Sequence, residues 1–170
     1  GSVIETDWVE QCKAVVHGYL GGQAGASAML EVLTGWQNPC GKLAETIPLR
    51  YEDAPAARYF PGKKQNAEYR EGLYVGYRYY ETANKAVRYP FGYGLSYTTF
   101  AYSDLKVNAD HVTFTLTNTG SCAGAEIAQL YVAKPDATVF RPAKELKGFT
   151  KVFLKAGESK TVTIPLDDKA

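Results

Sequence analysis

The feature that most constrains the fold is a strict alternation of apolar residues and threonines in the second half of the chain. Val112, Phe114 and Leu116 alternate with threonines, and the turn sequence Asn118-Thr119-Gly120 follows. Because successive side chains of a strand point to opposite faces, this pattern predicts a strand with one face in a core and the other towards solvent.

Further strands are predicted on both sides of clear turn signals. Apolar residues recur over 128–132, over 144–154 with a break at Gly148, and over 162–166. Short strands at this spacing are typical of a β-sandwich. About five strands can be placed before Ala170, whereas a sandwich of this kind has about seven, so we expect an incomplete sandwich that ends before its last strands.

The first fifty residues predict helices instead. Asp7, with Glu10 three residues later, forms a pair like a capping box, and apolar residues at helical spacing predict a helix from Asp7 to Leu20. A second helix is predicted over 25–34. Two short helices joined by a glycine-rich loop indicate part of an α/β layer. The predicted fold class is therefore an α+β multidomain fragment that ends in a β-sandwich.

Most of the 13 tyrosines lie between Tyr69 and Tyr102, interleaved with glycines. Tyrosine has a large apolar ring with a polar tip, and glycine allows close approach of backbones. This composition suits either a buried junction between domains or the wall of a sugar site. The first half of the stretch is strand-like by β-propensity. The polar segment 50–68 before it predicts a surface loop.

Composition excludes several classes of partner. The net charge is +1 without a basic run, so we expect no nucleic-acid partner. No apolar run approaches the roughly 20 residues of a membrane span, so no membrane partner is expected either. The three cysteines are far apart, which favours free thiols and a reducing, cytoplasmic location, with secretion as the alternative. Two isolated histidines predict neither a metal site nor a cofactor.

The sequence shows no motif that identifies a catalytic pair of carboxylates. Glycoside hydrolysis needs two carboxylates across the sugar, and Glu71 is the one carboxylate in a stretch expected to be buried. We expect Glu71 to form an ion pair with Arg70 or Arg78. The candidate carboxylates, all expected to have structural roles, are Glu5, Asp7, Glu52, Asp53, Glu68, Glu71 and the pair Asp167-Asp168.

Several motifs occur in a fixed order over nearly the whole chain. They are Tyr19–Gly25, Asn38–Pro48, Glu71–Tyr80, Tyr89–Thr98, Asn118–Gly120, Gln129–Val132 and Lys144–Phe149. In these motifs the chain resembles the C-terminal part of glycoside hydrolase family 3 enzymes, the β-glucosidase group. Cys40 stands where Ser is more usual in the family, a small-for-small change that we expect to be harmless.

The resemblance implies three domains: a (β/α)8-type barrel, an α/β sandwich domain and a fibronectin type III-like β-sandwich. Residues 1–50 would be the C-terminal part of the α/β domain, 51–100 a linker with the aromatic junction, and 101–170 the fibronectin-like domain without its last strands. A barrel needs about 250 residues, more than this chain has.

The implied chemistry is retaining removal of terminal non-reducing β-D-glucosyl residues. The implied nucleophile is an Asp of the barrel and the implied acid/base a Glu upstream of this chain, so we expect no catalytic residue here. Tyr93 is the one candidate for the pocket rim. The expected partners are a β-glucoside or oligosaccharide substrate and the remaining domains of the same enzyme.

Alternatives remain at this stage. The chain could be a non-catalytic carbohydrate- or protein-binding module, or the enzyme could be a β-xylosidase or α-arabinosidase. An incomplete sandwich exposes a sheet edge and an apolar face, which favours pairing with another chain. We therefore also expect a homo-oligomer.

Overall fold

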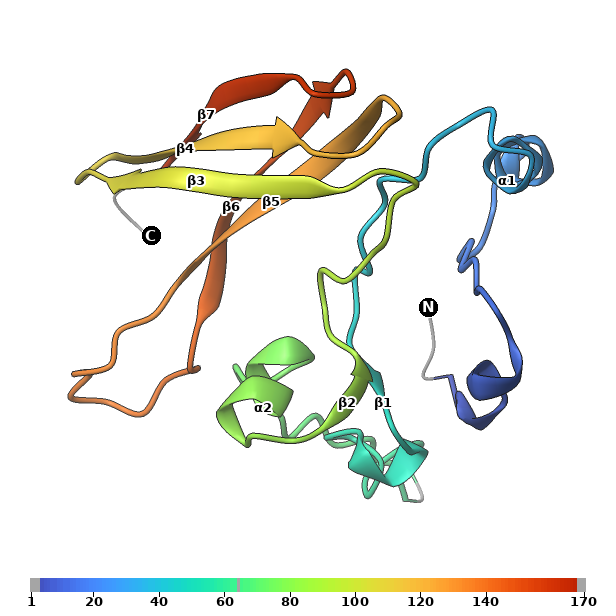
Figure 1. Cartoon of the computed structure of the whole chain (residues 1–170). Helices are drawn as coiled ribbons and strands as arrows, with labels where there is room; N and C mark the ends of the chain where they lie inside the picture. The colour runs from blue at the N-terminus through green and yellow to red at the C-terminus, as the bar shows by residue number, and fades with distance from the viewer. Residues whose placement is uncertain (1–3, 64, 168–170) are drawn as a thin grey trace. The chain divides into compact units, whose positions relative to one another are not determined.

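The computed structural model describes residues 4–63 and 65–167 of the chain (Figure 1). The chain divides into two compact units, each built from three separate segments. The aromatic unit comprises residues 1–20, 43–93 and 133–145. The sandwich unit comprises residues 21–42, 94–132 and 146–170.

The sandwich unit contains two sheets, and the pairs β3–β4 and β4–β7 of the larger one are antiparallel. The three-stranded sheet has the order β3 (Phe100–Val107), β4 (His111–Asn118) and β7 (Ser159–Pro165). The second sheet pairs β5 (Gly124–Val132) with β6 (Glu145–Leu154). The strands predicted over 112–117, 128–132 and 162–166 are confirmed, whereas β3 was not predicted separately.

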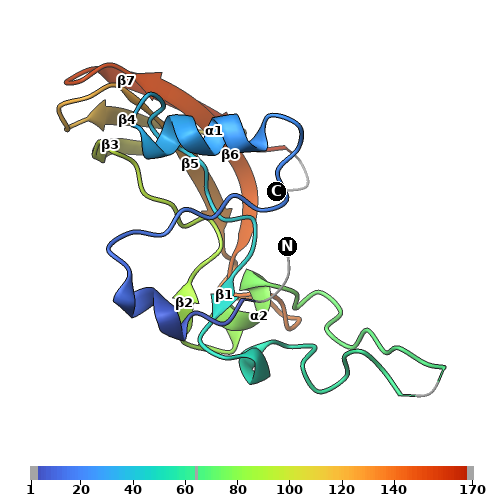
Figure 2. The same ribbon diagram turned by 90° about the vertical axis from the view of Figure 1, so that its right-hand side faces the viewer.

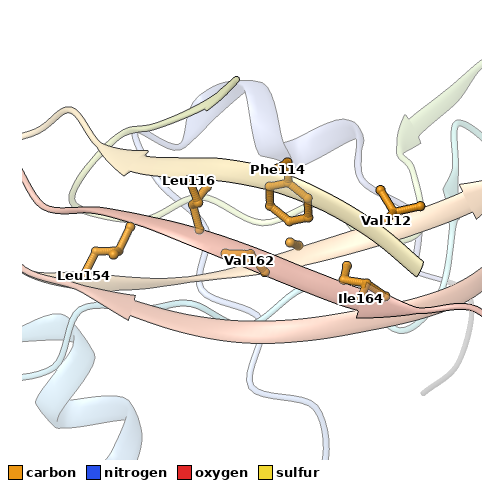
Figure 3. Close-up of a cluster of buried hydrophobic side chains, with 7 residues drawn as sticks. Val112, Phe114, Leu116, Leu154, Val162 and Ile164 are labelled. Carbon is orange, nitrogen blue, oxygen red and sulfur yellow. The ribbon is translucent and has the colours of Figure 1, made fainter. Parts of the chain in front are cut away.

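The alternation in β4 produces the core. Every second residue of β4 is buried, and Val112, Phe114 and Leu116 point between the sheets. Figure 3 shows them meeting side chains from β6 and β7, among them Leu154 and Val162. Burial of each such side chain stabilises the fold by about 1.5–3 kcal/mol relative to exposure.

The sequence predicted a break at Gly148 in the strand over 144–154. This prediction is wrong, because β6 runs unbroken from Glu145 to Leu154. Gly148 has a packing role instead. A Cβ atom at this position would lie 2.5 Å from Cγ2 of Ile164 on β7. Glycine inside a strand is thus explained here by close approach of a neighbouring side chain.

The second predicted helix is confirmed as α1 (Gly25–Leu33), and Gly35 follows with a φ of 79°. The first predicted helix is wrong. The structure has only a 3₁₀ helix, η1 (Asp7–Gln11), and Asp7 is its first residue, whereas Thr6 takes the N-cap position without a side-chain cap.

The apolar stripe that predicted this first helix is not covered. Trp8, Val15 and Val16 are between 42% and 47% exposed, and Leu20 is 95% exposed. Short amphipathic helices are marginal in water unless their apolar face is packed. Without that packing among the described residues, the segment after Gln11 has no regular structure.

The aromatic unit has little regular structure. Besides η1, its elements are β1 (Ile47–Pro48), which pairs with β2 (Val87–Tyr89), and the helices η2 (Tyr51–Asp53) and α2 (Tyr77–Thr82). Figure 2 shows the chain between η2 and α2 as a long excursion composed mostly of loop, which agrees with the prediction for residues 50–68.

The strand-like prediction for the first half of the tyrosine-rich stretch is wrong. Gly72 and Gly76 have φ values of 58° and 54°, in the left-handed region that interrupts a strand. Gly76 then takes the N-cap position of α2, so Tyr77, Tyr79 and Tyr80 are helical. No helix in the described part of the chain is both long and apolar enough to cross a membrane.

Candidate functional site: the aromatic cluster and the Asn38 seam

Paired rings form an aromatic cluster in the aromatic unit. Tyr77 stacks on Phe91 with ring centroids 4.8 Å apart, and Tyr89 stacks on Tyr93 at 5.2 Å. Stacked pairs of this kind contribute about 0.5–1.5 kcal/mol each beyond the area that they bury. We define the aromatic cluster as residues 77–80 and 89–93. The stacked rings in it pack mainly against one another.

Tyr93, the rim candidate, is held by its backbone. Its N–H donates to the carbonyl of Pro90 at 3.1 Å, and its carbonyl accepts from the N–H of Leu43 at 2.8 Å. Gly92, with a φ of 79°, allows the turn that these bonds close. The Tyr93 side chain remains 38% exposed beside its partner Tyr89. A held, partly exposed ring of this kind can offer a face or hydroxyl to a sugar.

Tyr80 occupies the interior of the aromatic unit and is 5% exposed. Desolvation by burial, with smaller contributions from Tyr79 and Asp53, raises the pKa of Tyr80 to about 12. Tyr80 therefore stays neutral at physiological pH, and its buried ring contributes to the packing of the unit.

Ion pairs surround the aromatic cluster. Arg78 Nε lies 3.6 Å from Glu145 Oε1, and Arg141 Nη2 lies 3.1 Å from Glu145 Oε2. Lys85 Nζ lies 3.5 Å from Asp53 Oδ1. All these side chains are partly exposed, so each pair is worth at most about 1 kcal/mol.

The predicted ion pair of Glu71 is wrong. Arg70 pairs with Glu68, and Arg78 pairs with Glu145. Glu145 is 74 residues after Glu71 in the sequence but belongs to the same unit. Within the described chain no ion pair involves Glu71. Nearness in sequence misled because the loop turns at Gly72.

The structure does not bring the candidate carboxylates together as a catalytic pair. Glu5 accepts from Trp8 Nε1 through its backbone carbonyl at 2.9 Å, and Glu52 is exposed. A pocket of about 460 Å³ between β6 and β7 is lined by one carboxylate, Asp167, whereas hydrolysis needs two. Asp168 lies outside the described residues. The described residues contain no group of three or more His, Cys, Asp or Glu side chains arranged to hold a metal.

Asn38 joins the segment after α1 to the sandwich. Its Oδ1 accepts from Ser96 Oγ and from the Tyr97 N–H, both at 2.8 Å. Its Nδ2 donates to the carbonyl of Ala123 at 3.0 Å. Tyr97 adds a bond from its hydroxyl to the carbonyl of Val32 on α1, at 2.7 Å. We call these contacts the Asn38 seam.

Lys42 and Gly94 extend the seam. Lys42 Nζ lies 3.0 Å from Glu126 Oε1 and donates to the carbonyl of Gly94 at 2.9 Å. A Cβ atom on Gly94 would lie 2.2 Å from the carbonyl oxygen of Gly41, so only glycine fits. The aromatic and glycine motif near Gly94 is thus explained by close packing.

Tyr102, on β3, lies near the same carboxylate. Its hydroxyl donates to Glu126 at 3.4 Å. Although about half of the Tyr102 side chain is exposed, its hydroxyl end is desolvated beside Glu126, and both effects, desolvation first, raise the pKa of Tyr102.

Asn118, which the sequence predicted only as the start of a turn, is a buried polar centre. Its Oδ1 accepts from Thr98 Oγ1 at 2.7 Å and from the Gly120 N–H at 3.1 Å. Its Nδ2 donates to the carbonyls of Cys122 and Leu154 at 2.9 and 3.2 Å. The sequence did carry a signal for this role. Asn118 is in phase with Val112, Phe114 and Leu116 on the buried face of β4, where the alternation predicts an apolar residue.

Two family profiles match the chain. The profile described as "Glycosyl hydrolase family 3 C-terminal domain" matches residues 1–97, and that of the "Fibronectin type III-like domain" matches residues 126–170.

Relatives match over the whole chain. Thermostable beta-glucosidase B of Acetivibrio thermocellus is 49% identical over all of this chain and 24% of its own length. An exo-alpha-(1->6)-L-arabinopyranosidase of Bifidobacterium breve is also 49% identical, over all of this chain and 23% of its own length. The solved structure of beta-glucosidase 3B from Thermotoga neapolitana in complex with glucose is 41% identical with a TM-score of 0.90, over 96% of this chain and 24% of that one. The chain thus spans about a quarter of the length of these relatives.

Proposed function

Because the chain belongs to glycosyl hydrolase family 3, we propose that it is part of a retaining β-glucosidase-like hydrolase. The enzyme removes terminal non-reducing β-D-glucosyl residues from a β-glucoside or oligosaccharide. The observation that carries this proposal is 49% identity to a beta-glucosidase along the entire chain. The chain supplies scaffold, and the catalytic Asp and Glu lie outside it.

We assign the parts of the chain within that enzyme as follows. Residues 1–50 form the C-terminal part of an α/β sandwich domain, 51–100 the aromatic linker, and 101–170 part of a fibronectin type III-like domain. The Asn38 seam supports the junction role of the linker's end, since it fastens Ser96 and Tyr97 to the segment after α1. Tyr93 is assigned to the rim of the substrate pocket.

A second candidate activity has a specific observation in its favour. The exo-alpha-(1->6)-L-arabinopyranosidase is as identical to this chain as the beta-glucosidase is. An α-arabinosidase or β-xylosidase activity is therefore the alternative within the family. The three cysteines are all free thiols, which supports the proposal of a bacterial cytoplasmic enzyme over a secreted one.

A chimera tests the activity. The matching quarter of thermostable beta-glucosidase B is replaced by this chain, and hydrolysis of an aryl β-D-glucoside and an aryl α-L-arabinopyranoside is measured. We expect the chimera to hydrolyse the glucoside and the isolated chain to hydrolyse neither. A Tyr93→Ala chimera should show a raised KM, and Tyr69→Ala, which makes the same change at a 91% exposed tyrosine outside the proposed rim, serves as its matched control.

The isolated chain tests the rest. Turnover by the isolated chain that disappears in Glu71→Gln would place the chemistry within these residues and overturn the scaffold role. Saturable binding of oligosaccharides to the isolated chain would instead support the alternative function, a non-catalytic binding module.

A further inference from the structure

One lysine of the sandwich unit is almost buried and holds a backbone carbonyl. The side chains of Lys42 and Glu126 are 15% and 13% exposed. Both carboxylate oxygens of Glu126 lie near Lys42 Nζ, at 3.0 and 3.2 Å, and the carbonyl oxygen of Gly94 accepts from Nζ at 2.9 Å. An ammonium group has three N–H donors, so each donor of Lys42 has an acceptor within reach. We call these three residues the Lys42 clamp.

Stability alone does not explain the ion pair of the Lys42 clamp. The desolvation of two charges offsets much of their attraction, so a well-packed apolar pair would stabilise this place equally well. The distinctive consequence of the charges is geometric. The Tyr102 hydroxyl donates to Glu126 at 3.4 Å, so the carboxylate is itself held from β3. The carboxylate fixes Lys42 Nζ, whose remaining donor then fixes the Gly94 carbonyl by a charge-assisted bond.

The residues next to the Lys42 clamp continue this hold on the backbone. Leu43, directly after Lys42, donates its N–H to the carbonyl of Tyr93, directly before Gly94, at 2.8 Å. The carbonyl of Leu43 accepts from the N–H of Gly92, also at 2.8 Å. Two consecutive residues, 42 and 43, thus hold the carbonyls of two consecutive residues, 93 and 94.

The backbone held in this way carries the side chain of Tyr93. The direction of a Cα–Cβ bond is set by the backbone, so a rotation of the peptide groups on either side of Tyr93 moves its ring. Such movements matter at a substrate site, because a misplacement of about 1 Å can cost up to 10²-fold in rate. The bonds to residues 93 and 94 therefore determine where the ring of Tyr93 can lie.

We propose that Lys42 and Glu126 are positioning residues for Tyr93 at the rim of the substrate pocket. This inference rests on the proposed function, which assigns Tyr93 to that rim. Glu126 lies in the segment that matches the fibronectin type III-like profile, whereas Lys42 and Gly94 lie in the segment that matches the family 3 C-terminal profile. Strand β5 of the sandwich thereby contributes to substrate binding without touching the sugar.

The test uses the chimera of thermostable beta-glucosidase B and this chain, with Lys42→Met and Glu126→Gln combined. The double change removes both charges, so no unpaired charge stays buried, and the new amide oxygen can still accept from Tyr102. We expect KM for the aryl glycoside that the chimera hydrolyses to rise about two- to tenfold, the worth of one ring or hydrogen-bond contact. The value of kcat should stay nearly unchanged, because a rim contact binds substrate and transition state alike.

The matched control combines Lys160→Met with Glu158→Gln. Lys160 also pairs with a glutamate, at 3.3 Å, and donates to a backbone carbonyl, that of Phe153, at 2.9 Å. The control therefore removes the same kinds of bond from the turn between β6 and β7, and it should leave KM unchanged.

A double-mutant cycle with Tyr93→Ala separates positioning from a general loss of structure. If Lys42 and Glu126 act through Tyr93, their substitution raises KM no further once the Tyr93 ring is removed. In the full 170-residue chain, their substitution should also speed hydrogen exchange of the Leu43 amide, whose acceptor is Tyr93, and leave the β4 amides protected.

An unchanged KM, or an equal rise with and without the Tyr93 ring, would overturn the positioning role while the proposed function stands. A chimera that hydrolyses neither glycoside would overturn the proposed function, and the positioning role with it. If the double variant fails to fold, as judged by circular dichroism, Glu126→Asp decides the matter. It keeps both charges but draws the carboxylate back by one methylene group, so KM should still rise about twofold, and an unchanged KM in this variant would overturn the proposal.

Discussion

The two units of this chain achieve order by different means. The sandwich unit buries a continuous apolar cluster that includes Leu116 and Leu154, both 0% exposed. The aromatic unit buries few side chains, such as Ile47 and Tyr80, and relies on stacked rings and partly exposed ion pairs. Apolar burial is insensitive to salt, whereas exposed charge pairs are screened by it. The contrast therefore predicts two classes of response to mutation.

The largest effect is expected in the sandwich core. Leu116→Ala leaves a cavity between the sheets and should lower the free energy of unfolding by about 3 kcal/mol. Urea titration followed by circular dichroism measures it, with the 72% exposed Leu95→Ala as the matched control. If both variants lose the same stability, the sandwich is not the dominant core.

Asn118→Ala should cost about 2 kcal/mol, because it leaves the buried carbonyls and hydroxyl that Asn118 satisfied without a partner. Asn108→Ala, at the exposed end of the same hairpin, changes the same residue type and should cost much less. Hydrogen exchange of the β4 and β6 amides locates the loss. Unchanged protection in the Asn118 variant would contradict the role of a buried polar centre.

Gly94→Ala tests the seam and should destabilise by about 1–2 kcal/mol, because the added methyl group meets backbone. Gly22→Ala is its control, since a Cβ at Gly22 meets nothing within 4 Å. Thermal unfolding should separate the two variants clearly. Equal Tm values would show that the chain near Gly41 moves aside at little cost.

In the aromatic unit, Arg78→Met should cost only about 0.5–1 kcal/mol at low salt, and the difference should shrink in concentrated salt. The same salt series on Leu116→Ala is the control and should show a constant difference. A large, salt-independent loss for Arg78→Met would break the comparison between the units.

The smallest effect appears only at high pH. The pKa of Tyr80 is raised from 10.0 to about 12, so its contribution is complete below pH 10 and is lost as pH rises towards 12. Tyr80→Phe cannot ionise and should lose less stability over that window. A pH series of urea midpoints measures this, and superimposable profiles would rule out a buried phenol as the cause.

Sequence patterns succeeded where local signals and tertiary packing agreed. The alternation of Val112, Phe114 and Leu116 predicted β4 because the opposite sheet covers that face. The stripe from Trp8 to Leu20 failed because nothing in the described chain covers it. Glu71 failed for a related reason, since contacts such as Arg78–Glu145 join residues far apart in sequence.

The same holds for the residues of the candidate site: local patterns identified their segments, but not their contacts. Tyr93 could be named from its motif, but one of the two backbone bonds that hold it comes from Leu43, fifty residues earlier. Asn38 and Asn118 belong to recognised motifs, yet their roles depend on carbonyls of strands that spacing alone does not bring together. Pattern therefore located the important segments, and only three-dimensional contacts gave their functions.

The interleaved path of the chain has a consequence for its inheritance. Each unit is assembled from three segments that alternate along the sequence. Any genetic crossover within the chain therefore splits at least one unit between two parents. A crossover between residues 42 and 94, for example, would bring together the two sides of the Asn38 seam from different parents, with contacts that had not been selected together. Residues 1–170 should accordingly recombine as a single block, and successful exchanges among relatives should have their breakpoints outside it.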